Sequence, residues 1–357
     1  MSDSEEGRMR IAVLDGDGIG PEVVPAAVSV AERALDKQGI GVQVTRLPFG
    51  AAAIDSHGVP IPGSTLDALA EFDLWLVGPH DSAAYPAELR HPAPGAVMRK
   101  QFDLFSNLRP ARAVSGVPAT TPDIDVLIVR ENSEGLYADR NMAVGSGEFM
   151  PTPDVALSVG LITRTATERI AVEAFEAARR RRGHVTVVHK ANVLRMTTGL
   201  FRDVCLQVAQ RYPDVRVDTE HVDAMAALLV RRPADFDVIV TENLFGDILS
   251  DLAAELSGSL GLAASLNSSA DRAMAQAVHG AAPDIAGRGL ANPVATIASA
   301  AMLLRWHGER SADDATLRAA DAIDGAVSHV LADGVLTADL GGSASTAEFT
   351  RAVIEAL

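Results

Sequence analysis

The stretch that decides the fold is Thr241–Ser259, TENLFGDILSDLAAELSGS, which follows a short apolar strand. It places Asp247, Asp251 and Glu255 four residues apart, so on a helix the three carboxylates share one narrow stripe. Carboxylate oxygens at this spacing suit a hard divalent cation such as Mg²⁺ or Mn²⁺, although most such pairs are ordinary exposed helix positions. No Lys or Arg occurs between Arg232 and Arg272, so neutralising charge has to come from elsewhere in the chain. The buried face of the helix is expected to consist of Phe245, Ile248, Leu249, Leu252 and Leu256.

The composition indicates a globular protein of about two domains, because the chain has 357 residues and 48% hydrophobic content. A formal net charge of −16 argues against a nucleic-acid-binding or anionic-membrane surface, since both need a basic face. The single cysteine, Cys205, excludes an intrachain disulfide and is expected to be a buried thiol. The acidic N-terminus does not resemble a secretory signal, and no apolar run approaches the roughly 18 residues of a membrane span. We therefore expect a cytoplasmic protein.

The chain begins with alternating strand and helix signals, which are typical of an α/β fold. A short apolar strand, RIAVL, ends at Leu14 and leads into the glycine loop DGDGIGPEVV. Gly16, Gly18 and Gly20 are spaced G-x-G-x-G before Pro21, which does not match the G-x-G-x-x-G of a Rossmann motif. No linker separates the alternating elements, so a second domain is expected to be inserted in the first.

Three arginines and a tyrosine lie around the next apolar strands. Arg99 and Arg109 bracket an expected helix and the strand after it, and Arg130 directly follows the strand VLIV. Tyr137 comes seven residues later. Because α/β enzymes build their sites at the carboxyl edge of the sheet, these guanidiniums are candidates for a carboxylate clamp, with ordinary surface arginines as the alternative.

A lysine and a long loop complete the candidate residues. Lys190 is one of three lysines and the only one that closes an apolar strand, where desolvation would fit it for proton transfer; the alternative is a side chain that reaches the surface. Asp223 lies at a strand-to-helix junction and could also be a helix cap. The polar segment 139–165 suggests an extended hairpin that reaches a partner subunit. The loop before a helix near Pro293 is long enough to hold a ligand.

Taken together, the motifs resemble the β-decarboxylating dehydrogenases of the isocitrate and isopropylmalate dehydrogenase family over nearly the full chain. The motifs are LDGDGIGPEV, LFSNLRP, VRENSEGLY, HKANVLR, VDAMAALLV, TENLFGDILSDL and HGAAPDIAGRGLANP, in the family's order. The resemblance implies a two-domain α/β/α fold with a large mixed sheet and without a Rossmann domain. Residues 1–105 plus 258–357 would form the larger, cofactor-binding domain. Residues 106–257 would form an inserted domain that carries the dimer interface and the metal aspartates.

The resemblance also implies roles for individual residues. Tyr137 and Lys190 match the family's catalytic proton-transfer pair, and the substrate would contact Arg99, Arg109, Arg130, Tyr137, Lys190 and Asp223. Mg²⁺ or Mn²⁺ would bind Asp247 and Asp251 of one subunit and Asp223 of the partner subunit, which implies a homodimer whose subunits share their active sites. NAD would contact Asp15, Gly16, Ile19, Asn192, His279, Gly280, Ala282, Pro283, Asp284, Ile285 and Asn292. The NADP-using relatives tend to carry Lys and Tyr at the positions of Asp284 and Ile285, so we expect NAD.

The implied reaction is the oxidative decarboxylation of a (2R)-hydroxy acid with a carboxylate on C3 to a 2-oxo acid, CO₂ and NADH. The helix that reads the C3 substituent begins APGAVMRK, which matches neither isocitrate nor isopropylmalate enzymes. Small residues at Gly95 and Ala96 are expected to leave room for a longer substituent. Homoisocitrate, 3-isopropylmalate and isocitrate therefore all remain candidates, and a tartrate or D-malate dehydrogenase is an alternative. A non-catalytic regulatory subunit is disfavoured because Tyr137, Lys190 and the three aspartates are present.

Overall fold

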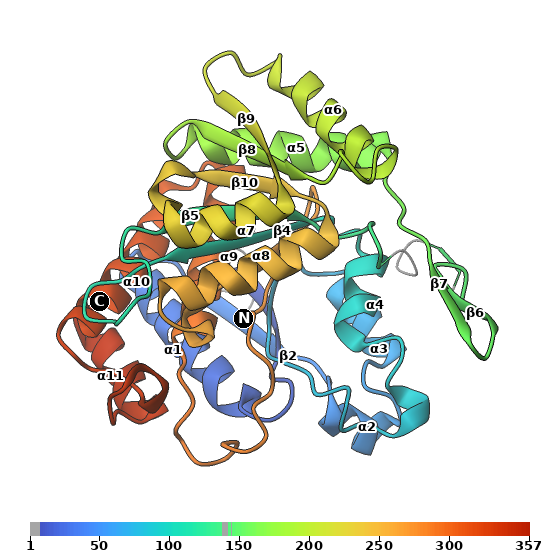
Figure 1. The fold of residues 1–357 in the computed structure, drawn as a ribbon. Coiled ribbons are helices and arrows are strands. Elements are labelled where there is room, and N and C mark those ends of the chain that lie inside the picture. Colours follow the sequence, from blue (N-terminus) through green and yellow to red (C-terminus); the bar gives the residue numbers. More distant parts are fainter. Residues whose placement is uncertain (1–7, 138–141, 144) are drawn as a thin grey trace.

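A ten-stranded mixed sheet runs through the centre of the protein (Figure 1). The computed structural model describes residues 8–137, 142–143 and 145–357. From edge to edge the strand order is β2-β1-β3-β12-β11-β4-β5-β10-β8-β9. The strands are β1 (Met9–Leu14), β2 (Val42–Arg46), β3 (Leu74–Val77), β4 (Ser106–Arg112), β5 (Asp125–Glu131), β8 (His184–His189), β9 (Arg216–His221), β10 (Val238–Thr241), β11 (Leu266–Ser268) and β12 (Ala273–Ala275).

Antiparallel pairs lie only in the middle of this sheet. β4 is antiparallel to both β5 and β11, and β11 is antiparallel to β12, whereas the strands on either side pair in parallel. A short antiparallel segment of this kind joins two parallel α/β halves into one sheet without a linker. The expected fold class, α/β with a large mixed sheet and no Rossmann domain, is confirmed.

Helices cover both faces of each half of the sheet. Successive residues of a strand point to opposite faces, and because apolar residues are buried on both, each face needs a covering layer. In the first half, Ile11 and Val13 pack with one apolar cluster, and Ala12 and Leu14 pack with another on the opposite face. The first cluster is covered by α1 (Gly20–Asp36), α9 (Val294–Ser311), α10 (Asp314–Ala332) and α11 (Thr346–Ala356), and the second by α3 (Gly63–Leu69) and α4 (Pro94–Gln101). The short helix α2 (Ala51–His57) precedes α3 in the chain.

The second half has the same three-layer build. One face of β5, β8 and β10 packs against α5 (Arg164–Arg179) and α6 (Thr197–Ala209), and the other against α7 (Val222–Arg231) and α8 (Asn243–Ser257). Short 3₁₀ turns lie at η1 (Ala87–Leu89), η3 (Pro233–Asp235), η4 (Leu260–Leu262) and η5 (Ala338–Leu340). The division at residues 105 and 257 stays a prediction, because Leu108 of β4 packs against clusters of both halves.

Outside the main sheet, β6 (Glu148–Thr152) and β7 (Val155–Ser158) form the hairpin expected within 139–165, and Figure 1 shows it projecting from the body. Residues 139–141 and 144 of that segment lie outside the described residues. Cys205 is fully buried, as expected, and burial raises the pKa of its thiol. In the described ranges, no helix combines the length and the apolar character needed to cross a membrane.

Candidate active site

The site is built on α8, whose start is fixed by a buried acid. Glu242 precedes the helix, and its carboxylate accepts hydrogen bonds from the backbone N–H groups of Leu244 (3.1 Å) and Phe245 (2.8 Å). Leu249 and Leu256 are buried as expected. The expected burial of Ile248 is wrong, because its side chain is 57% exposed. The buried stripe is centred on Leu249, and Ile248 lies about 100° away from it around the helix.

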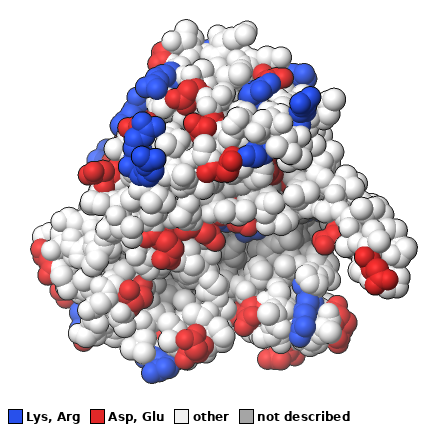
Figure 2. Space-filling view, in the orientation of Figure 1, with Lys and Arg blue, Asp and Glu red and all other residues white. Residues whose placement is uncertain are grey.

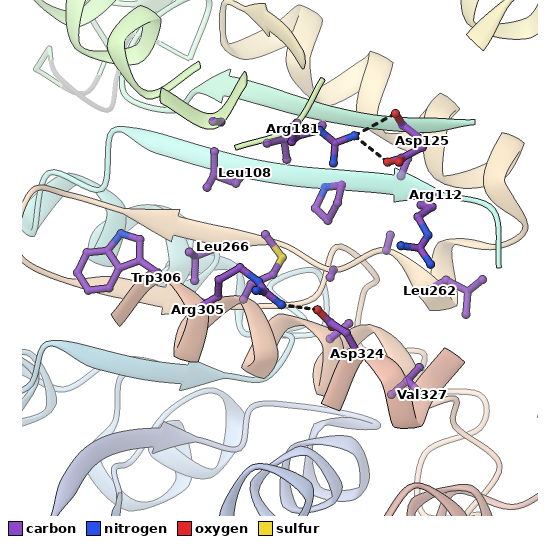
Figure 3. Close-up of a pocket in the computed structure, with 18 of the residues that line it drawn as sticks. Leu108, Arg112, Asp125, Arg181, Leu262, Leu266, Arg305, Trp306, Asp324 and Val327 are labelled. Carbon is purple, nitrogen blue, oxygen red and sulfur yellow. Dashed lines mark hydrogen bonds and ion pairs between the residues drawn. The ribbon is translucent and has the colours of Figure 1, made fainter. Parts of the chain in front are cut away.

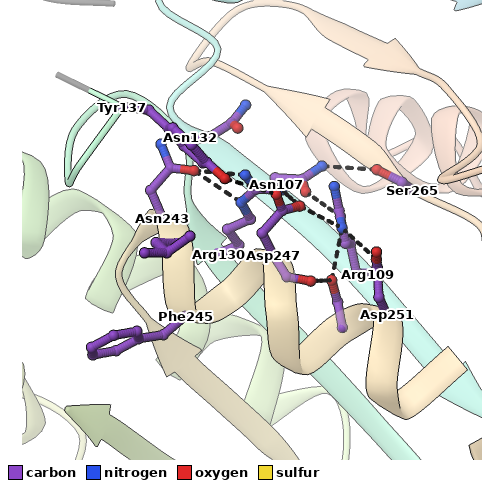
Figure 4. Close-up of polar contacts among 12 residues, drawn as sticks. Asn107, Arg109, Arg130, Asn132, Tyr137, Asn243, Phe245, Asp247, Asp251 and Ser265 are labelled. Carbon is purple, nitrogen blue, oxygen red and sulfur yellow. Dashed lines mark hydrogen bonds and ion pairs between the residues drawn. The ribbon is translucent and has the colours of Figure 1, made fainter. Parts of the chain in front are cut away.

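The acidic stripe of α8 meets positive charge from two neighbouring strands (Figure 4). Asp247 Oδ1 forms ion pairs with Nη1 of Arg130 on β5 and, at 3.2 Å, with Nη1 of Arg109 on β4. Arg109 Nη1 also lies 3.3 Å from Asp251 Oδ1, and the Tyr137 hydroxyl donates to Asp247 Oδ2 at 3.2 Å. The missing charge noted in the sequence thus comes from the two arginines at the centre of the sheet.

Arg130 is fixed by close packing as well as by hydrogen bonds. Its Nε and Nη2 donate to Asn243 Oδ1 at 3.0 and 2.7 Å, and the Asn243 amide donates in turn to the Glu134 carbonyl at 2.9 Å. The arginine crosses α8 at Gly246, where a Cβ atom would lie 2.6 Å from Arg130 Cγ and 2.8 Å from its Cβ. Only glycine leaves room for the side chain of Arg130, a residue that is 2% exposed.

Arg109 is held by a buried polar network. Its Nε donates to Asn107 Oδ1 and its Nη1 to Ser250 Oγ, both at 2.7 Å. The Asn107 amide then donates to Ser265 Oγ at 2.8 Å and to Asn267 Oδ1 at 3.1 Å. Burial, together with the nearby charge of Arg130, lowers the pKa of Arg109 to about 10. The guanidinium remains protonated at neutral pH and is aimed at the acidic stripe.

The two aspartates differ in their affinity for protons. Burial alone would raise the pKa of Asp247, but the charges of Arg130 and Arg109 outweigh it and the pKa is lowered. Burial raises the pKa of Asp251, and the neighbouring charges of Asp247 and Glu255 add to that rise. Asp247 is therefore the more firmly ionised of the two carboxylates.

Arg99 and His80 occupy the opposite wall of the site. Arg99 of α4 donates to Gln276 Oε1 at 3.3 Å, and its charge contributes to the lowered pKa of Asp247. One turn earlier, a Cβ at Gly95 would lie 2.9 Å from His80 Nε2. The imidazole of His80 thus lies where a side chain at Gly95 would project, and the expectation that Gly95 and Ala96 leave room for a longer substituent stays a prediction. Figure 2 shows the hollow beneath α8, with acidic side chains along its upper edge.

Lys190 and Asp223 form a separate pair. Lys190 Nζ donates to Asp223 Oδ1 at 2.5 Å, and this hydrogen bond lowers the pKa of Asp223. Asp223 is the second residue of α7 and not its cap, a place taken by His221. The lysine side chain is 23% exposed, so it is neither fully desolvated nor free in solvent. In the described part of the chain, no three His, Cys, Asp or Glu side chains come together as a metal site.

The glycine loop after β1 contacts the loop 279–292. Gly16 and Gly18 have φ of +77° and +57°, and a Cβ at Gly18 would lie 1.9 Å from the Ala281 carbonyl oxygen. The Ile19 N–H donates to the same oxygen at 2.9 Å. His279 Nε2 is buried without a hydrogen-bond partner among the described residues, and burial lowers the pKa of this imidazole. The two loops thus form one backbone-lined surface with an unsatisfied ring nitrogen.

The other residues expected to contact the cofactor differ in their exposure and in their partners. Gly280, Pro283 and Asp284 are exposed in the 279–292 loop, and Ala282 and Ile285 are partly buried there. Asp15 pairs with Arg46, and the Asn292 amide donates to Asp339 Oδ2 at 2.9 Å. Asn192 is exposed, two residues after Lys190.

The profile of the isocitrate/isopropylmalate dehydrogenase family matches residues 10–353. The chain belongs to this family. It is 41% identical to a 3-isopropylmalate dehydrogenase of Archaeoglobus fulgidus, over 98% of this chain and 99% of that protein. It is 42% identical to an isocitrate/homoisocitrate dehydrogenase of Thermus thermophilus, over 98% of each. The crystal structure of isocitrate dehydrogenase from Methylococcus capsulatus superposes with a TM-score of 0.86 at 40% identity, over 98% of this chain and 99% of that one.

Membership of this family and the similarity to these relatives show that the chain is an oxidoreductase of the decarboxylating dehydrogenase class.

The sequence did not indicate several residues that hold the arginines of the site: Asn107, Asn243, Ser250 and Gln276. Asn243 lies one turn before Asp247 on the same helix stripe, and Asn107 lies two residues before Arg109 on the same strand face, so periodicity could have indicated both. Nothing in the sequence indicates Gln276 or His80.

Proposed function

We propose that the protein is an NAD-dependent, Mg²⁺- or Mn²⁺-dependent dehydrogenase that oxidatively decarboxylates a 3-substituted malate. The observation that carries this proposal is the convergence of Arg109 and Arg130 on Asp247, with the Tyr137 hydroxyl at 3.2 Å from the same carboxylate. Fixed guanidiniums beside paired carboxylates are suited to a polycarboxylic acid bound together with a divalent cation. Arg99, on the opposite wall, supplies the third positive charge for the substrate.

The residues present fit both groups that the family generally uses. Asp247 and Asp251 offer hard oxygen ligands on consecutive turns of α8, which would hold Mg²⁺ or Mn²⁺ together with Asp223 of the partner subunit. Such a cation stabilises negative charge that develops on the substrate oxygen during decarboxylation. For NAD, the unsatisfied His279 Nε2 and the glycine backbone suit adenosine and pyrophosphate groups, and exposed Asp284 can accept from ribose hydroxyls.

The side chains of the protein then divide the proton transfers between them. Lys190 of the partner subunit would take the proton of the substrate's C2 hydroxyl, and NAD⁺, when bound, would supply the hydride acceptor for C2. Tyr137, beside Asp247, returns a proton to C3 after CO₂ has left. The arginines hold the remaining carboxylate so that C2 and C3 stay between these two groups.

A homodimer follows from the need to complete each site. Lys190 and Asp223 pair with each other, apart from Asp247, so the full set of residues requires a second subunit. Apolar side chains lie exposed on the elements nearest that pair and on the hairpin: Ile248, Val230, Val193, Met196, Met150 and Leu157. A second copy of the chain would bury them.

His80 bears on the choice of substrate. Its ring fills the space over Gly95 and places Nε2 against the helix that also carries Arg99. A polar ring atom there favours a C3 substituent that ends in a carboxylate over an aliphatic one. On this ground homoisocitrate and isocitrate rank above 3-isopropylmalate, and we place homoisocitrate first.

A panel of 3-substituted malates with NAD⁺ and Mn²⁺ tests the proposal through the absorbance of NADH. The proposal expects turnover of at least one of homoisocitrate, 3-isopropylmalate and isocitrate, with release of CO₂. D-malate and tartrate serve as comparison substrates without a C3 carbon substituent. Faster turnover of D-malate or tartrate, or no NADH from any of the 3-substituted acids, would contradict the proposed substrate class.

A further inference from the structure

A second cavity lies on the face of the sheet opposite the active site. It has a volume of about 610 Å³ and is lined by residues of β4, β5, α9 and α10, among others (Figure 3). Side chains alternate along β4, so Asn107 and Arg109 face α8 whereas Leu108 and Arg112 line this cavity. We call it the back groove. The strand that carries the active-site Arg109 is therefore also a wall of the back groove.

The floor of the back groove is apolar and comes from both halves of the sheet. Leu108 and Leu127 belong to β4 and β5, whereas Leu266 and Val327 belong to β11 and α10. A cavity of several hundred Å³ with an apolar floor and charged side chains around it has the size of a small-molecule site.

The charged residues around the groove leave one arginine without a partner. Arg181 pairs with Asp125 at 2.7 Å, and Arg305 pairs with Asp324 at 2.8 Å. Two further ion pairs join the α5 region to α9. Arg180, which directly follows α5, pairs with Glu309 at 3.4 Å, and Glu173 of α5 pairs with Arg310 at 3.6 Å. Among the described residues, Arg112 alone of these five lining arginines has no hydrogen bond or ion pair from its side chain.

One residue that lines the groove carries a buried N–H group without an acceptor. Trp306 lines the cavity, is 6% exposed, and its Nε1 has no hydrogen-bond partner among the described residues. The second tryptophan, Trp75, shows the usual arrangement, because its Nε1 donates to the Phe72 carbonyl at 2.9 Å. A buried N–H group without a partner favours a ligand that brings an acceptor atom.

We propose that the back groove binds an amphipathic carboxylic acid of medium length. Its carboxylate pairs with Arg112, and its apolar body lies on Leu108, Leu266 and Val327. Trp306 Nε1 donates to an acceptor on the ligand or to a water that the ligand orders. Asp324 lies close enough for the charge of Arg112 to act on it, but its carboxylate is paired with Arg305 at 2.8 Å and forms no ion pair with Arg112. Because substrate and this ligand would lie on opposite faces of β4, they bind at the same time.

The test is a titration of the full-length protein with hexanoate, octanoate and decanoate, read by tryptophan fluorescence and by calorimetry. Octanoate or a neighbouring chain length is expected to give a saturable change of emission that is lost in Trp306→Phe. Octylamine and octan-1-ol have a matching apolar chain without the negative charge and are expected to bind at least about tenfold more weakly.

Arg112→Gln is expected to weaken carboxylate binding at least about tenfold, and Arg112→Lys less. Arg112 is exposed and its side chain has no hydrogen bond or ion pair to lose among the described residues, so both variants should fold. Arg351→Gln on α11, an exposed arginine outside the groove, is the matched control and should bind as the wild type does. Equal binding of octylamine, unchanged binding by Arg112→Gln, or no saturable signal by either method would overturn the proposal. Displacement of octanoate by the active-site substrate would also overturn it.

Discussion

Replacing Gly246 by alanine tests whether the packing of Arg130 against α8 sets the active site. The added Cβ would lie 2.6 Å from Arg130 Cγ, whereas ordinary carbon contacts are about 3.5–4.0 Å. The clash involves the first two carbons of the side chain, which sit close to the β5 backbone and cannot rotate away cheaply. Either α8 or the guanidinium must therefore move by about 1 Å.

The change has opposing effects on stability and one large effect on activity. Overpacking costs about 1–3 kcal/mol, but alanine in a helix interior returns about 1 kcal/mol relative to glycine. The net loss in the free energy of unfolding is therefore about 0–2 kcal/mol. Activity depends on the position of Arg130 relative to Asn243 and Asp247, and a misplacement of about 1 Å can lower kcat/KM by about a hundredfold.

The assay compares urea unfolding with kcat/KM on the best substrate of the panel. Gly325→Ala is the matched control, because Gly325 lies inside α10 and a Cβ there would have no neighbour within 4 Å. The control should gain up to about 1 kcal/mol of stability and keep full activity. A Gly246→Ala variant with kcat/KM within about twofold of the wild type would refute the idea that this contact positions Arg130.

Further predictions concern the metal, the lysine and the cofactor. Asp247→Asn is expected to lower activity and metal affinity more than tenfold, and Asp251→Asn is expected to lower both quantities as well. Titration of EDTA-treated protein with Mn²⁺ measures metal affinity and the activity that the metal restores. Turnover without metal would contradict the role of the two aspartates as metal ligands. Lys190→Met should abolish NADH formation, because it removes the group proposed to take the hydroxyl proton, and sedimentation should still show a dimer. Turnover retained by this variant would show that Lys190 takes no part in the reaction. NAD⁺ should be favoured over NADP⁺ by at least about a hundredfold in kcat/KM, roughly 2.7 kcal/mol. Asp284→Lys with Ile285→Tyr should narrow that gap, and equal use of both cofactors by the wild type would contradict the prediction.

Much of the fold could be predicted from periodicity and glycine spacing. The strand RIAVL ends at Leu14 as expected, and the rejected Rossmann spacing agrees with a glycine loop that adopts positive φ and contacts Ala281 instead. Local pattern does not specify strand partners, so the insertion of short β11 and β12 between β3 and β4 could not be foreseen. That insertion brings together segments more than 150 residues apart, such as Asn107 and Ser265.

The candidate active site could be predicted where a single helix or strand carries several of its residues. Spacing along α8 placed Asp247 and Asp251 on one stripe, and the apolar run VLIV placed Arg130 at the carboxyl end of a strand, which β5 (Asp125–Glu131) shows. Spacing could not reveal that His80 fills the volume over Gly95, because the two belong to different loops and helices. The exposure of Ile248 was missed for a related reason: a single chain's pattern does not distinguish a face buried in its own core from one that another chain could cover.

The separate Lys190–Asp223 pair has a genetic consequence on the proposed dimer. A copy damaged at Lys190 still carries an intact Asp247, and a copy damaged at Asp247 still carries an intact Lys190. When two such copies associate, one of the two sites receives an undamaged residue from each chain. Two inactive alleles can therefore complement each other in one cell, whereas two copies with the same lesion cannot.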